Sequence, residues 1–259
     1  MSQVFRRSLF VLLVLAARTD AAEPTWSLPD DPRAVVLQMQ FADGSGTVVH
    51  TVLTVQRDGT FTDGDAAQRG TFAGRMSTDE LHELLGAIIE NDRVLDLTSA
   101  SLLDQIESEA RRTSKDWRIQ NATTVVIRVG LADRTHVVEC LSPDLMRTRY
   151  PAIRELDRLC AVRHRLQNVV AVSRVGGLEE ARRLAALATA ELRRQNGSDI
   201  QIGPRDLVQV RGTIGDLRQV QFVVEPALHP EAGESVHVCV FESPGSAPRI
   251  SLTPVARPL

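Results

Sequence analysis

The chain has 259 residues, which exceeds one typical domain and suits two cores of about 100 residues each. Its 30 basic and 33 acidic residues nearly balance, so no field of a single sign favours a nucleic acid as partner. The 43% hydrophobic and 24% charged content is typical of ordinary globular protein. Composition therefore bounds the class of protein and does not indicate an activity.

The N-terminus has the layout of a secretory signal peptide. Arg6 and Arg7 precede an apolar run at 9–17, and the small residue Ala21 follows a polar stretch. The run is much shorter than the roughly 20 residues of a membrane-spanning helix, although a permanent anchor is the alternative. We expect a signal peptide at 1–21, and a secreted or periplasmic protein with no membrane span after cleavage.

Residues 22–33 carry three prolines and are typical of an extended linker. An α+β domain of unknown function is then expected over residues 34–165. Its β-rich runs are separated by turn residues and predict an antiparallel sheet. These runs lie at 34–41, 47–55, 60–62, 71–75, 122–129 and 135–141.

Two helices are expected to pack on this sheet. The first begins at Ser77, where Glu80 three residues later completes a capping box, and Pro151 is suited to open the second. The pattern weakens over 94–117, which predicts an exposed loop. The order of a DGT turn, a capped helix and the TTVVIRV run at 123–129 loosely resembles a domain of uncharacterised function in bacterial exported proteins. That resemblance implies no activity.

A second domain is expected over residues 174–254. A helix over 178–196 has one apolar stripe rich in alanine, with acidic residues in its first turn and arginines in its last. Strand-like segments follow at 200–202, 207–211, 217–225, 235–242 and 250–252. One helix packed on an antiparallel meander is the fold that this order predicts.

Over residues 176–252 the chain resembles the cystatin family. Gly176-Gly177 stands where cystatins carry their N-terminal glycine, and an alanine-rich helix follows, as in cystatins. The segment VQVRGT at 208–213 is similar to the first inhibitory hairpin, with pattern Gln-x-Val-x-Gly, but Val208 replaces the glutamine. Pro244 matches the proline of the second hairpin, which lacks the tryptophan of the family.

This resemblance implies a non-enzymatic protein that binds or inhibits a papain-like cysteine protease. In cystatins the N-terminal segment and the two hairpins form a wedge that enters the protease cleft, and glycines permit close backbone approach. The missing glutamine and tryptophan remove two of the anchors that such a wedge uses. The protease-binding residues implied are Gly176, Gly177, Val208, Gln209, Val210, Arg211, Gly212, Pro244 and Gly245.

Two other functions stay open at this point. The protein could be an exported envelope or extracellular module that binds other proteins without inhibiting them. A hydrolase has little support. His136 and Cys140 lie four residues apart on a predicted strand, roughly 13 Å by strand rise, and His164 follows Cys160 at a fraying helix end. We therefore expect no catalytic residues.

No cofactor or metal site is expected either. The six histidines have no paired ligand spacing, and no glycine-rich phosphate loop is present. Asp58-Gly59 and Asp63-Gly64-Asp65 resemble calcium loops but lack the distal glutamate, so we expect hairpin turns there. Three cysteines leave at least one unpaired; Cys140 and Cys160 are either bridged or, like Cys239, buried as small apolar residues.

Overall fold

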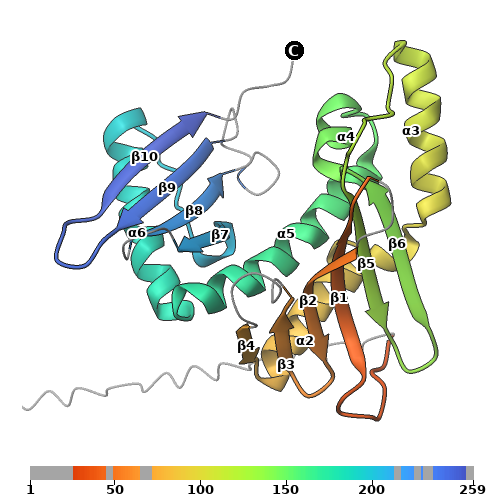
Figure 1. Ribbon diagram of the computed structural model, residues 1–259, viewed down its shortest axis with the longest axis horizontal. Helices are drawn as coiled ribbons and strands as arrows, with labels where there is room; N and C mark the ends of the chain where they lie inside the picture. Colours follow the sequence, from red (N-terminus) through yellow and green to blue (C-terminus); the bar gives the residue numbers. More distant parts are fainter. Residues whose placement is uncertain are drawn as a thin grey trace, which may run out of the picture.

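The computed structural model describes residues 26–44, 49–64, 72–212, 217–224, 229 and 236–254. The expected signal peptide at 1–21 lies outside the described residues. The chain forms two antiparallel sheets with helices packed on them (Figure 1). The α+β class that the sequence predicts is therefore confirmed.

The first sheet has the strand order β4-β3-β2-β1-β5-β6. Its strands are β1 (Val35–Ala42), β2 (Val49–Gln56), β3 (Thr60–Asp63), β4 (Phe72–Arg75), β5 (Thr124–Gly130) and β6 (Thr135–Leu141). Met39 of the central strand β1 pairs with Leu53 on one side and Ile127 on the other, and all three side chains are fully buried. Alternating apolar residues thus place one face of every central strand in the core.

The turn at Asp58-Gly59 is a hairpin turn, as expected. Asp58 Oδ1 accepts a hydrogen bond from the Thr60 backbone N–H at 2.9 Å, and this bond lowers the pKa of the carboxyl. Gly59 has φ +83° and a Cβ there would clash with the carbonyl oxygen of Met76. The glycine is therefore required by the turn itself. Of the second calcium-like motif, Asp65 lies outside the described residues.

The first expected helix is α2 (Thr78–Gly86), which continues as the π-helical segment η1 (Ala87–Asn91). Ser77 Oγ accepts the Glu80 N–H at 3.2 Å, and the Ser77 N–H donates to Glu80 Oε2 at 2.7 Å. The predicted capping box is confirmed. The helix buries Leu81 and Leu85.

The expected loop at 94–117 is wrong. The segment contains a short 3-10 turn, η2 (Val94–Asp96), and the four-turn helix α3 (Ser99–Thr113), whose N-cap is Thr98. Leu102, Ile106 and Ala110 repeat every four residues and are buried against the first sheet. Only this narrow stripe is buried, and the surrounding charges obscured the helical period in the sequence.

A short helix, α4 (Pro143–Arg149), also follows β6 where no helix was expected. The next helix begins at Arg154, because Pro151 lies in the preceding turn and Ile153 is the extended N-cap residue. The predicted start at Pro151 is therefore wrong by three residues.

The helix α5 (Arg154–Val175) is 22 residues long and passes from the first sheet to the second (Figure 1). Leu156, Leu159 and Leu166 pack in the first hydrophobic core, whereas Ala171 and Val175 pack in the second. Residue 165, where the sequence places the end of the first domain, lies inside this helix. The division into domains 34–165 and 174–254 stays a prediction, and one helix joins the two parts.

The second sheet has the order β10-β9-β8-β7 and is a consecutive meander. Its elements are α6 (Leu178–Asn196), η3 (Pro204–Asp206), β7 (Leu207–Gly212), β8 (Arg218–Val224), β9 (Val236–Glu242) and β10 (Arg249–Pro254). The alanine-rich stripe of α6 packs on Val220, Phe222, Val238 and Val240. The bounds of this helix and the four strands agree closely with the sequence prediction.

Residues 200–202 do not form the predicted strand. The Ile202 N–H donates to Thr189 Oγ1 at 2.9 Å, and Thr189 Oγ1 also lies 3.3 Å from the Ile202 carbonyl oxygen. A side chain of α6 therefore takes the backbone bonds that a neighbouring strand would make.

Residues 26–33, the described part of the expected linker, lie against the first core. Trp26 Nε1 donates to Glu90 Oε1 at 3.0 Å, the Trp26 ring stacks on His82, and Leu28 packs with the core. None of the helices in the described ranges has the length and apolarity needed to cross a membrane.

Candidate functional site

One end of the second sheet brings together segments that are far apart in the sequence. Gly212, the last residue of β7, pairs with Arg218 of β8, which in turn pairs with Glu242 of β9. Pro244 and Gly245 follow Glu242 in the connection to β10. Because the strands form a meander, the end of β7, the start of β8 and the β9–β10 connection lie at the same end of the sheet. We call it the hairpin end, comprising Gly212, Arg218, Glu242, Pro244 and Gly245.

The turn between α5 and α6 reaches the same end. Arg218 Nη1 donates a hydrogen bond to the carbonyl oxygen of Val175 at 2.8 Å, directly before Gly176. Of the nine site residues predicted from the sequence, Gly176, Gly177, Arg211, Gly212, Pro244 and Gly245 therefore gather here. Val208, Gln209 and Val210 lie further along β7, beside a cavity described below.

Gly176 and Gly177 form a tight turn between two packed helices. Their φ angles are +110° and +97°, a region that favours glycine, and the Gly177 N–H donates to the Val172 carbonyl at 2.9 Å. In cystatins the matching glycine belongs to a flexible N-terminal segment. Here α5 precedes the glycines, so a turn between two helices occupies the place of that segment.

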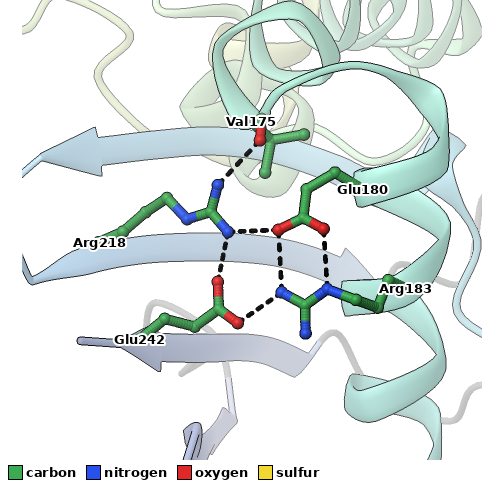
Figure 2. A network of polar contacts seen from close by, with 5 residues as sticks. All are labelled: Val175, Glu180, Arg183, Arg218 and Glu242. Atoms are coloured by element: carbon green, nitrogen blue, oxygen red, sulfur yellow. Dashed lines mark hydrogen bonds and ion pairs between the residues drawn. The ribbon is translucent and has the colours of Figure 1, made fainter. Parts of the chain in front are cut away.

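Four charged side chains hold these elements together (Figure 2). Glu180 and Arg183 come from the first turns of α6, Arg218 from the start of β8, and Glu242 from the end of β9. Arg183 Nε donates to Glu180 Oε2 at 2.8 Å, and Arg183 Nη2 donates to Glu242 Oε1 at 2.5 Å. Arg218 Nη2 bonds both carboxylates. Each arginine thus bridges the same two glutamates.

The network has two positive and two negative charges, and these interactions shift the pKa values of its glutamates. Hydrogen bonds from Arg183, reinforced by those from Arg218, lower the pKa of Glu180 from 4.5 to about 2. The pKa of Glu242 is also lowered, since its bonds to Arg183 and Arg218 outweigh its partial burial. Networks of this kind, made of charge-assisted bonds, fix geometry more strongly than isolated surface pairs.

The stability of the second sheet and its helix α6 should decrease at acid pH, because Glu180 becomes protonated there. Since the pKa of Glu180 is lower in the folded chain, its stabilisation is present above pH 4.5 and is lost as the pH falls towards about 2. Unfolding by urea, followed by circular dichroism from pH 7 to pH 2.5, should therefore show a shallower loss of stability in Glu180→Gln than in wild type. The variant should also be less stable at pH 7.

Glu191 provides the matched control. It lies on the same helix and its pKa is also lowered to about 2, by Arg194 and then Gln195. Both partners belong to α6, so Glu191→Gln breaks no contact between elements. If both substitutions lowered the stability equally at pH 7, Glu180 would not stabilise the chain by connecting α6 to the strands.

Sequence reasoning missed this network for a physical reason. Glu180 and Arg183 were visible as charges in the first turns of α6, but their partners lie on strands, 38 and 59 residues away along the chain. Nothing in the local sequence marks Arg218 or Glu242 as partners of the helix.

The three cysteines are free thiols. Cys140 and Cys160 are buried, and Cys239 is half-buried. Burial raises the pKa of Cys140 to about 12 and also raises that of Cys160, so both thiols stay protonated at neutral pH. The alternative of a Cys140–Cys160 bridge is not seen, and the two residues pack as small apolar groups.

Across the described part of the chain, no three His, Cys, Asp or Glu side chains come together as metal ligands would. Comparison with known proteins gave no match to a family model, a curated protein or a solved structure. The assignment to the cystatin family thus stays a resemblance in the sequence.

Proposed function

We propose that this chain is an exported, non-enzymatic protein that binds another protein through the hairpin end, and that its target class is the papain-like cysteine proteases. The observation that supports this most is the placement of the α5–α6 turn, the paired ends of β7 and β8, and the β9–β10 connection at one end of the sheet. These are the counterparts of the three elements with which cystatins contact a protease.

The ion-pair network supports the proposal by preorganising that end. A binding surface that is already ordered loses less conformational entropy when the partner docks, so more of the contact energy appears as affinity. Arg218 connects the carbonyl of Val175, Glu180 and Glu242, and so fixes all three elements relative to one another. The fixed Gly176-Gly177 turn would take the place of a flexible segment.

Gly212 is the residue best suited to probe this surface. Its φ lies outside the left-handed region, and nothing lies within 4 Å of the position that a Cβ would take. A larger side chain therefore projects into open space without straining the chain itself. A partner that approaches the backbone closely would meet that side chain.

The test is inhibition of papain by the full chain. We expect wild type to slow hydrolysis of a chromogenic peptide at micromolar concentration, and Gly212→Trp to weaken inhibition about ten-fold or more. Thr253→Trp is the control, because Thr253 is exposed on β10 and pairs with His237 at the opposite end of the sheet.

Absence of inhibition by wild type at micromolar concentration would contradict the target class. Equal inhibition by wild type and Gly212→Trp, with both folded by circular dichroism, would contradict the use of the hairpin end. If both tryptophan variants lost inhibition, the large side chain would act at either end of the sheet, and the result would not assign the contact surface to the hairpin end.

A further inference from the structure

A cavity of about 470 Å³ lies between the first sheet, α5 and strand β7. This volume falls in the range of ligand-binding pockets. One wall is formed by Val208, Gln209 and Val210 of β7, and the opposite wall by the ends of β1 and β2. None of the residues that define the hairpin end lines this cavity.

An oriented arginine lines this cavity. Asp63, at the end of β3, is only 1% exposed, and its Oδ2 accepts a hydrogen bond from Nε of Arg174 on α5. The Arg174 side chain is 29% exposed, and within the described residues its two Nη atoms make no hydrogen bond. A buried carboxylate thus fixes the guanidinium by one edge and leaves the other donors for a ligand.

The β7 wall supplies a second kind of contact. β7 is the last strand in the order β10-β9-β8-β7, and its only strand partner is β8 within the described part of the chain. Asn168 of α5 donates to the Leu207 carbonyl at 2.8 Å, which covers the start of this edge. The next three residues of the strand, Val208, Gln209 and Val210, line the cavity. An edge strand binds extended peptides through its main chain.

We propose that this cavity binds an extended peptide through a carboxylate, which pairs with the Nη atoms of Arg174 while the peptide backbone lies along β7. The other titratable groups that line the cavity are Asp43 and His50. Together with Asp63, the Asp43 carboxylate disfavours a doubly charged phosphate, so a singly charged carboxylate fits better. The carboxylate is either the C-terminus of the peptide or an Asp or Glu side chain.

The chain contains a close structural match to the Arg174–Asp63 pair. Arg165, on the same helix, donates through Nε to Oδ2 of the buried Asp92 at 2.7 Å. Arg165 does not line the cavity. Replacing either arginine with glutamine removes the arginine partner of a buried carboxylate, so both variants should lose stability for the same reason. Only Arg174→Gln should lose ligand binding.

The experiment uses the immobilised full chain and three pools of randomised, N-acetylated heptapeptides. One pool has a free C-terminal carboxyl but no Asp or Glu, one is amidated and contains Asp and Glu, and one is amidated and has no carboxylate. Retained peptides are quantified by mass spectrometry. We expect wild type to retain at least one carboxylate pool about ten-fold more than the third pool. The pool retained identifies the source of the carboxylate.

Four variants decide the outcome. Arg174→Gln and the double variant Asp63→Asn with Arg174→Gln should both lose the enrichment, and the double variant also removes the charge of the buried carboxylate. Thr123→Trp should also lose it, because Thr123 is exposed and lines the cavity, so that a large side chain blocks it. Arg165→Gln should keep the enrichment. Equal retention of all three pools by wild type, retention by the double variant, or equal loss in Arg165→Gln would overturn the proposal.

Discussion

Replacing Val169 with proline is expected to lower the free energy of unfolding by about 3 kcal/mol or more and to uncouple the two sheets. Val169 lies inside α5, between Leu166, which packs in the first core, and Ala171, which packs in the second. Proline removes a backbone hydrogen bond and clashes with the preceding turn, so the helix kinks where it connects the two cores. The cavity beside α5 should then lose its geometry.

The two tryptophans make this uncoupling measurable. Trp26 and Trp117 are the only tryptophans in the chain, and both pack against the first core. Tryptophan fluorescence therefore reports on the first part, whereas circular dichroism reports on the whole chain. In urea we expect the two signals to change together in wild type and at separate midpoints in Val169→Pro.

Arg154→Pro is the matched control for this substitution. Arg154 is exposed and is the first residue of the same helix, and the Ile153 backbone before it is already extended. Proline is tolerated at that position, so the urea midpoint should change little. Coincident transitions in Val169→Pro at the wild-type midpoint would show that α5 does not couple the two parts.

The parts of the fold that could be predicted from the sequence are those that local chemistry determines. The capping box at Ser77 and Glu80 joins residues three apart, and the hairpin turn at Asp58-Gly59 is built from adjacent residues. The stripe of α6 repeats over five turns, which makes its helical period clear. In each case the residues that make the structure are close neighbours in the sequence.

The errors arose where tertiary contacts decide the structure. In α3 only Leu102, Ile106 and Ala110 are buried, and the packing surface that they contact is supplied by distant strands. The second half of α5 is apolar on more than one side because it passes between two cores, so its helical period was obscured.

The candidate site was predictable only in part. Glycine and proline motifs located the turns at the hairpin end, since those residue types are required by turn geometry. The bonds from Arg218 to Glu180 and Glu242 join residues 38 and 24 positions apart, and the Asp63–Arg174 pair spans 111. Such pairings depend on how the strands and helices pack and leave no spacing signal in the sequence.

A second large effect is expected from Asp206→Ala, which should lower the free energy of unfolding by about 3 kcal/mol. Asp206 lies in η3, where α6 leads into β7, and its side chain is fully buried. Its Oδ2 accepts the Gly203 N–H at 2.7 Å, and its Oδ1 lies 3.0 Å from Nε2 of His229, which is 2% exposed. Alanine leaves the half-buried Gly203 N–H and the buried His229 ring without this partner.

The measurement is the urea midpoint followed by circular dichroism, with Asp199→Ala as control. Asp199 lies seven residues earlier, is fully exposed, and reaches Arg193 only at 4.0 Å, so its removal should change stability little. Asp206→Asn should be less harmful than Asp206→Ala, because its side-chain oxygen still accepts the Gly203 N–H. If Asp206→Ala were as stable as Asp199→Ala, the buried pair would not hold η3 to the β8–β9 connection. The start of β7 would then depend mainly on the bonds that Asn168 donates to Pro204 and Leu207.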